Sequence, residues 1–569
     1  MERADLLFVN GRVVTVDGAD TVASALAVTG DTIAAVGSRE EVEARIGGAA
    51  TVVDLRGGTL LPGINDSHLH AVNTGYNAPP FCVDVGHPAV GSIAEAVRAV
   101  AERAAATPPG EWIVGVGWDT GYLQECLDDP SRQPTRQDLD AVAPDHPVFL
   151  HDFSRHAAWV NSMALAKAGI DRATEPPPGS IIVRDESGEP TGMLGEGASV
   201  MVEDLLPPIT VALSKAAIAA TTARWLTPLG ITSLTEPGLG PGGNKGIMGM
   251  GENGLHAYRE LLAEGNLEVR LSALLYMAET GGGFAEFKAG LDSFAVPESS
   301  DPRMLNVIGV KLFADGIPPA KTAWMHEEYV DGGFGGLVVG GADEAKQVAE
   351  LRAMVSYAHS LGHQVGIHVT GDRGIDAVVD AYAAAVAEHP ASDPRHYVIH
   401  GDFITARALE VCRREGFGVN FNPTIKWTIA DLEEEFVGPE RAAYEWPYRA
   451  ALDAGVNVAS SSDSPVTEPD WRQGVSTMVL RESKASGRVS GPDQRISVTE
   501  ALRTYTINAA WQDFAEEWKG SLEEGKVADL CVLEQDILAI DPHEIPAAEV
   551  TMTVLGGTVL REAAGVSRG

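Results

Sequence analysis

The stretch QVGIHVTGD (364–372), together with GIDAVVDAYAAAVAEH (374–389) directly after it, decides the fold class of this chain. The first segment is a short apolar run that ends in Thr, Gly and Asp, as buried strands do, and the second has apolar residues at helical spacing. The same pattern recurs in 306–316 with 343–362, in 396–404 with 405–416, and in 417–424 and 456–466 with helical stretches around 441–455 and 498–508. Repeated units of strand, loop and helix predict a parallel sheet, and about eight of them predict a closed α/β barrel.

The two ends of the chain are expected to form one small β domain. Residues 5–60 contain short apolar runs separated by Asn-Gly and Gly-Asp, which are hairpin signals, and the C-terminal residues show a similar habit. We therefore assign 1–60 and 515–569 to this domain, and 61–514 to the barrel. Within 75–205 the strand-like and helical stretches do not follow the barrel order, so we expect an insertion there.

The composition excludes several classes of function. The chain has 569 residues, and 80 Asp and Glu against 42 Lys and Arg give a formal net charge of −38. Without a basic run, it is not expected to bind nucleic acid or an anionic membrane surface. The four cysteines form no short pairs, which argues against a disulfide framework or a Cys-x-x-Cys site. No apolar stretch is long enough to span a membrane and charged residues open the chain, so we expect a cytoplasmic protein.

The candidate metal ligands lie at the ends of predicted strands. In GTLLPGINDSHLHAV (58–72) an apolar strand leads into His68 and His70, whose i, i+2 spacing on an extended chain lets both imidazoles face one ion. A single His-x-His is weak evidence, but Lys311, His368, His400 and Asp463 also follow or end predicted barrel strands. Because the carboxyl ends of barrel strands meet at one mouth, these residues are expected to share a site.

These motifs, in this order, resemble the amidohydrolase superfamily of metal-dependent hydrolases, and within it the branch typified by N-substituted formamide deformylases. The order His-x-His, Lys, His, His, Asp is the superfamily's binuclear pattern. Branch-like sequence extends over residues 5–560 and includes WIVGVGWD, RHAAWVNSMAL, HVTGDRGIDAVVDAY and SDSPV. The resemblance implies a (β/α)8 TIM barrel with a β-sandwich domain formed from both chain termini.

The resemblance also implies a binuclear centre. His68, His70 and Asp463 would hold one divalent metal, His368 and His400 the other, and Lys311, carbamylated by carbon dioxide, would bridge them. Zinc suits such imidazole and oxygen ligands, with manganese or iron as alternatives. A hydroxide formed from water between the metals would attack the substrate, with Asp463 as general base and then general acid. Asp463, Lys311 and His400 are therefore the expected catalytic residues.

The expected substrate is a small linear amide, an N-formyl or N-acyl amine with a hydrophobic or aryl substituent. The same chemistry on a carbamate, cyclic amide, ester or lactone stays open. A ring deaminase is disfavoured, because such enzymes carry Glu where this chain has Gly371 and lack the lysine that is present here as Lys311. A non-catalytic scaffold is disfavoured because every expected ligand is present. The resemblance favours a homodimer.

Substrate specificity is expected to depend on two departures from the branch and on a set of weaker candidates. HGDF (400–403) and NFNPTIKW (420–427) replace the more common His-Ala-Gln and Gln-Pro-Thr-His sequences, at places where we expect the substrate. Carboxylates, polar groups and aromatic residues in or near predicted loops are candidates for the pocket, although each also fits a turn, core or lid role. They are Trp118, His156, Asn161, Glu196, Asp315, Trp324, Arg373, Phe421 and Trp427.

Overall fold

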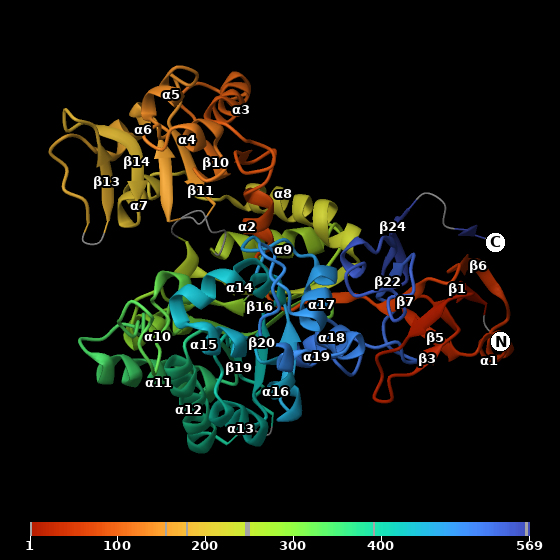
Figure 1. The fold of residues 1–569 in the computed structure, drawn as a ribbon. Helices are drawn as coiled ribbons and strands as arrows, with labels where there is room; N and C mark the ends of the chain where they lie inside the picture. Colours follow the sequence, from red (N-terminus) through yellow and green to blue (C-terminus); the bar gives the residue numbers. More distant parts are fainter. Residues whose placement is uncertain are drawn as a thin grey trace. The chain divides into compact units, whose positions relative to one another are not determined.

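The computed structural model of the chain is drawn in Figure 1. It describes residues 3–153, 156–177, 180–244, 251–296, 298–390, 393–563 and 567–568; parts of the expected insertion and of the C-terminal β segment lie outside these ranges. Two compact units are distinguished. The first comprises Met1–Ala71, Ala220–Gly243 and Leu255–Gly569, and the second comprises Val72–Ala219 and Asn244–Gly254.

An eight-stranded parallel sheet forms the centre of the first unit. Its strands, in order, are β8 (Ile64–Asp66), β15 (Ile231–Leu239), β16 (Arg270–Leu275), β17 (Leu305–Phe313), β18 (Gln364–Val369), β19 (Tyr397–His400), β20 (Gly418–Phe421) and β21 (Asn457–Ser460). Most of their residues are buried, as expected when both faces of a parallel sheet are covered.

The first and last strands meet through the residues that follow them. The Ser67 hydroxyl donates to the Ser460 carbonyl at 2.8 Å, and the backbone N–H of Asp463 donates to the His68 carbonyl at 2.9 Å. These bonds bring β8 beside β21 and close the ring. The predicted (β/α)8 barrel is confirmed.

Helices follow the barrel strands in the order that the sequence predicts. The helix α12 (Asp372–Glu388) buries Ile375, Val378, Val379 and Tyr382, the helical spacing of one apolar face. The helix α13 (Ala406–Glu415) begins where the Thr405 hydroxyl accepts from the Ala408 N–H. The other helices of this unit, apart from 3₁₀ and π turns, are α1 (Arg39–Arg45), α10 (Phe284–Ser293), α11 (Glu344–Ser360), α14 (Pro423–Val437), α15 (Pro439–Tyr444), α16 (Tyr448–Asp453), α17 (Trp471–Leu480), α18 (Val498–Thr504) and α19 (Ile507–Gln512).

Strands from both ends of the chain share two further sheets of this unit. One has the order β25–β6–β1–β4–β5 and the other β24–β23–β22–β7–β2–β3. Their bounds are β1 (Ala4–Val9), β2 (Arg12–Val14), β3 (Val22–Ala23), β4 (Ala25–Thr29), β5 (Thr32–Gly37), β6 (Ala49–Asp54), β7 (Thr59–Pro62), β22 (Leu530–Leu533), β23 (Val550–Leu555), β24 (Thr558–Glu562) and β25 (Ser567–Arg568). Phe8, Leu26, Leu530 and Met552 lie in one apolar core, which joins the two ends as expected.

The second unit is built on a six-stranded sheet of order β13–β14–β12–β11–β10–β9. Its strands are β9 (Val83–Asp84), β10 (Ile113–Trp118), β11 (Val148–Asp152), β12 (Ala157–Val160), β13 (Ile181–Arg184) and β14 (Pro190–Gly195). Its helices are α3 (Ile93–Ala106), α4 (Gln124–Asp128), α5 (Arg136–Asp140), α6 (Ser162–Ala168) and α7 (Gly197–Glu203), and α2 (Ala71–Tyr76), α8 (Val211–Thr221) and α9 (Glu252–Ala263) lie at its boundaries. Across the described part of the chain, no helix combines the length and apolarity needed to cross a membrane.

Candidate metal centre

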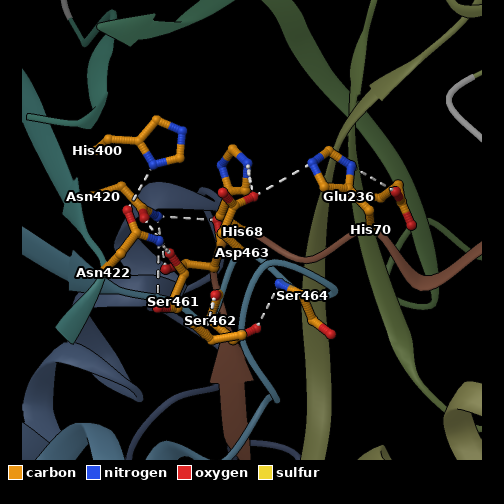
Figure 2. Close-up of polar contacts among 12 residues, drawn as sticks. His68, His70, Glu236, His400, Asn420, Asn422, Ser461, Ser462, Asp463 and Ser464 are labelled. Atoms are coloured by element: carbon orange, nitrogen blue, oxygen red, sulfur yellow. Dashed lines mark hydrogen bonds and ion pairs between the residues drawn. The ribbon is translucent and has the colours of Figure 1, made fainter. Parts of the chain in front are cut away.

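Three of the predicted ligands converge at the mouth of the barrel (Figure 2). His68 follows β8, His400 ends β19 and Asp463 follows β21, and one ligand atom of each lies within 4.8 Å of the other two. The His68 Nε2 is 3.1 Å from the Asp463 Oδ1. Because a zinc ion lies about 2 Å from nitrogen and oxygen ligands, three atoms this close together can all reach one ion.

His70 lies beside this group and contacts a carboxylate that we did not predict. Its Nε2 is 3.5 Å from the Asp463 Oδ1, and its Nδ1 is 3.3 Å from the Oε1 of Glu236, a buried residue of β15 (Figure 2). The other oxygen of Glu236 accepts from the Tyr258 hydroxyl at 2.9 Å and from the Ala71 N–H at 2.7 Å. Burial alone would lower the pKa of His70, but the hydrogen bonds to Asp463 and Glu236 outweigh it and raise this pKa to about 9.

His368 and Lys311 complete the predicted set from neighbouring strands. The His368 ring is 4.5 Å from the His400 ring, centre to centre, and its Nε2 lies 3.0 Å from the Gly316 carbonyl. A carbonyl only accepts, so the Nε2 of His368 carries the hydrogen and its Nδ1 keeps a free lone pair. Burial lowers the pKa of His368 to about 4 and that of Lys311 to about 7, which favours the neutral forms that bind metals or react with carbon dioxide.

A buried amide network fixes the tautomer of His400 (Figure 2). The Nδ1 of His400 donates to the Asn422 Oδ1 at 2.7 Å, which leaves its Nε2 free as a ligand atom. The Asn422 Nδ2 donates to the Ser461 hydroxyl at 3.0 Å, and that hydroxyl donates to the Asn420 Oδ1 at 2.5 Å. Such partners hold a metal-binding imidazole in one orientation.

This network bears on one expectation about specificity. Asn420 and Asn422 are fully buried and Asp402 is 3% exposed, so these side chains do not present a surface to a substrate. At Asn420 and Asn422, the departure from the branch sequence therefore supplies hydrogen bonds behind His400. Sequence reasoning missed that role because the donors and acceptors come from separate strands.

A second buried carboxylate, Asp66, was also missed. Its Oδ1 accepts from the Ser462 N–H at 3.1 Å and from the His68 N–H at 3.4 Å, so it joins two loops that carry metal ligands. Burial raises the pKa of Asp66 to about 7. Its place in the strand end that delivers His68 was the available signal, since a buried Asp at a strand end needs partners.

Among the weaker candidates in the first unit, Asp315 has a clear structural role. It is buried, and its carboxylate accepts from the backbone N–H groups of Trp324, Thr370 and Gly371 at 2.8–3.0 Å. It thereby joins the loops that follow β17 and β18. The Arg373 guanidinium lies 4.3 Å from the centre of the Trp324 ring and donates to Glu344, an exposed pair at the start of α11.

Of two further aromatic candidates, one ends a barrel strand and the other lies within a helix. Phe421 is the last residue of β20, and it is fully buried with its ring 5.0 Å from that of Tyr448. Trp427 lies within α14 and not in a loop, because Pro423 begins that helix directly after the strand. The Lys484 ammonium lies 4.9 Å from the Trp427 ring centre.

The remaining candidates belong to the second unit. Trp118 is 4% exposed and donates from its indole to the Leu150 carbonyl, and Asn161 caps α6 by accepting from the Ala164 N–H. The His156 Nδ1 lies 3.1 Å from the Glu196 Oε2, and both side chains are about half exposed. Glu196 has φ +53°, a left-handed backbone that non-glycine residues rarely adopt.

The geometry of the first unit agrees with comparisons to known proteins. Residues 51–561 match the model of the amidohydrolase family. This chain belongs to the amidohydrolase family. The expected resemblance and the expectation of a hydrolytic enzyme are therefore confirmed.

Relatives of this amidohydrolase match along nearly their whole length. It is 29% identical to the N-substituted formamide deformylase of Arthrobacter pascens, over 99% of both chains. It is 28% identical to the putative amidohydrolase YtcJ of Bacillus subtilis, over 93% of this chain and 94% of that one. A metal-dependent hydrolase structure from Pyrococcus furiosus is 26% identical with a TM-score of 0.71, and covers 94% of this chain and 99% of its own.

The residues of this amidohydrolase fit a divalent metal, which the family implies. The free lone pairs of His368 and His400 follow from their fixed hydrogen bonds, and the Asp463 carboxylate faces two further imidazoles. Burial would raise the pKa of Asp463, but the neighbouring His68, His70 and His400 hold it well below its usual range, so the carboxylate stays ionised. The neutral imidazoles of His368 and His400 and the ionised carboxylate of Asp463 are the donors that such metals need, whereas His70 would bind an ion only on losing its proton.

Proposed function

We propose that this amidohydrolase cleaves the C–N bond of a linear amide, an N-formyl or N-acyl amine with a hydrophobic or aryl substituent. The observation that carries the proposal is the convergence of His68, His400 and Asp463, with His70 beside them, at one barrel mouth. The substrate class is supported by the similarity, over essentially the whole chain, to an enzyme named for deformylation of N-substituted formamides.

We propose two divalent metals, zinc first, with manganese or iron as alternatives. His68, His70 and Asp463 would hold one ion, His368 and His400 the other, and Lys311 would bridge them as a carbamate. Lys311 is 1% exposed with its Nζ 4.8 Å from the centre of the Phe313 ring, and burial lowers its pKa to about 7, so this site disfavours the cation. A carbamate replaces that cation by an anion that can bridge metals.

When bound, divalent metals polarise the substrate carbonyl and lower the pKa of water. Asp463 would take the proton of the attacking water on its carboxylate and return it to the departing nitrogen. The water oxygen joins the carbonyl carbon, the C–N bond breaks, and an amine and a carboxylate leave. Asp463 suits this role because it is ionised and lies within reach of two ligand imidazoles.

Amine release from a panel of substrates tests the proposal. Zinc-loaded enzyme would be incubated with N-formyl, N-acetyl and carbamoyl derivatives of benzyl, aryl and alkyl amines, and ammonia would be measured in parallel. We expect release of the amine from N-formyl or N-acyl compounds, and loss of that release in Lys311→Ala. An enzyme that holds metal but releases no amine from any of them contradicts the proposal and favours an ester, a lactone or a cyclic amide.

A further inference from the structure

The backbone at His400 is strained where β19 ends. Its φ is +73°, in the left-handed region that non-glycine residues rarely adopt, and Gly401 follows with φ +60°. The pairing of β19 with β20 extends only to Ile399, one residue before this ligand. A strained residue at the end of a strand keeps its conformation only where its surroundings fix it.

Trp446 supplies two hydrogen-bond donors to this strained segment. Its indole Nε1 donates to the His400 carbonyl at 3.0 Å, and its backbone N–H donates to the Asp402 carbonyl at 2.8 Å. These bonds lie on either side of Gly401 and hold the turn from both ends. Trp446 is 1% exposed and has φ +47°, so it is itself held in an uncommon conformation.

Two buried cations hold Trp446 and the residues before it. The Arg481 Nη1 donates to the Trp446 carbonyl at 3.0 Å, and its Nη2 donates to the Glu445 carbonyl at 2.9 Å. The Lys426 ammonium donates to the Ala442 carbonyl and to the Glu445 carboxylate, each at 2.8 Å. Arg481 and Lys426 are both 2% exposed, so solvent does not compete for these bonds.

We propose that Trp446 is a positioning residue for the metal ligand His400. Its two N–H groups hold the turn at 400–402, in which His400 and Gly401 have positive φ, and that turn directs the His400 imidazole toward Asp463 and Asn422. The inference rests on the proposed metal-binding role of His400 and does not depend on which amide the enzyme cleaves. It also explains why Arg481 is buried beside residues 443–446 and not exposed at the surface.

The variant Trp446→Phe tests this proposal, with Trp471→Phe as the matched control. Trp471 is also buried in the first unit, and its indole donates to the Leu229 carbonyl at 2.7 Å, away from the metal ligands. Each variant loses one indole hydrogen bond and keeps an aromatic ring. Cobalt(II) affinity would be measured by chelator competition, together with the visible spectrum of the bound cobalt and the melting temperature.

We expect Trp446→Phe to weaken cobalt binding about 10- to 100-fold and to change the spectrum. Trp471→Phe is expected to lower the melting temperature and leave both metal readouts unchanged. Equal losses of stability with unchanged cobalt affinity and spectrum in both variants would overturn the proposal. If Trp446→Phe does not fold, Arg481→Lys, which loosens the hold on Trp446, must weaken cobalt binding. A wild-type protein that binds no cobalt overturns both this inference and the metal centre, whereas cobalt binding without amide hydrolysis overturns only the proposed substrate.

Discussion

The carboxylate of Glu236 lies 3.3 Å from the Nδ1 of His70 and turns the other ring nitrogen toward Asp463. We expect Glu236→Gln to weaken zinc binding about 10- to 100-fold, because the amide no longer offers His70 a charged acceptor. Zinc bound per chain after dialysis against graded chelator measures the effect. Glu344→Gln is a suitable control, since Glu344 is exposed and pairs only with Arg373 among the contacts described above.

Substitution of Tyr258 tests how the orientation of Glu236 matters while its charge is kept. Tyr258→Phe removes the hydroxyl that donates to the Glu236 Oε2 and leaves the carboxylate in place. We expect it to weaken zinc binding less than Glu236→Gln does, because the Ala71 N–H still holds the same oxygen. A larger effect in Tyr258→Phe would contradict the assignment of Glu236 as the acceptor that orients His70.

Asp463→Asn is expected to lower kcat by about 10²- to 10⁴-fold, the usual contribution of a general acid–base residue. Asparagine cannot take up the proton of the attacking water. Metal content must be measured on the same sample, because Asp463 is also a proposed ligand, and the loss of turnover should persist at full metal occupancy. Asp453→Asn, an exposed residue paired with Arg449, is the control. Turnover within a few-fold of wild type would rule out the proton-transfer role.

Much of the barrel could be predicted because its information is local. The strands that carry Lys311, His368 and His400 are apolar runs with a helix after each, and the ligands lie at their carboxyl ends. Glu236 could not be placed in the same way. It lies in the fully buried strand β15, and the partner that explains it is His70, which belongs to another part of the sequence.

The apolar pattern also predicts one helix where the backbone forms two. The expected helical stretch around 441–455 is interrupted at Glu445–Pro447, between α15 and α16. Trp446 has a positive φ there, which its sequence does not indicate, although Pro447 marks a possible break. The break between the helices gives the Trp446 indole access to the His400 carbonyl. Trp446 is therefore both the residue that interrupts the expected helix and the residue whose role beside His400 the sequence did not indicate.

A pair of histidines outside the metal centre predicts loss of stability in acid. The Val365 N–H donates to the His396 Nδ1 at 3.0 Å, the His396 Nε2 lies 2.9 Å from the His359 Nδ1, and the His359 Nε2 lies 2.7 Å from the His389 carbonyl. One set of neutral tautomers satisfies all three contacts, and an added proton on His396 has no acceptor. Burial, and then His359, lower the pKa of His396 to about 3.

Because the pKa of His396 is lower in the folded state, acid destabilises the fold at this residue. An unfolded histidine titrates near pH 6.5, well above the folded value, so the contribution of His396 is complete above pH 6.5 and is lost as the pH falls toward 3. We expect the free energy of unfolding, measured in urea, to fall by up to about 1.4 kcal/mol per pH unit from this residue. His396→Asn keeps an acceptor for Val365 and should flatten that part of the slope. An unchanged slope would falsify the assignment.

The buried carboxyl of Glu433 destabilises the fold at neutral pH, so its replacement is expected to raise stability. It is fully buried in α14, and within the described structure neither carboxylate oxygen has a hydrogen-bond partner. Burial, and then the nearby Glu445, raise its pKa well above the usual range. An acid shifted upward costs stability once the pH exceeds its unfolded pKa of about 4.3, because the unfolded chain ionises first.

We therefore expect Glu433→Gln to raise the free energy of unfolding at pH 7 by about 1–3 kcal/mol, because the suppressed ionisation of the wild-type carboxyl costs up to about 1.4 kcal/mol per pH unit above its unfolded pKa. The gain should shrink toward pH 3.5, about one pH unit below the unfolded pKa, where the wild-type carboxyl is mostly neutral in both states. Thermal melts at both pH values measure it. Glu434→Gln, one residue along the same helix, is the control, because Glu434 pairs with Arg488 at 2.6 Å and is partly exposed, so its loss should be neutral or slightly destabilising. A destabilised Glu433→Gln at pH 7 would mean that the buried carboxylate has a partner, such as an ordered water or a cation, that stabilises its charge.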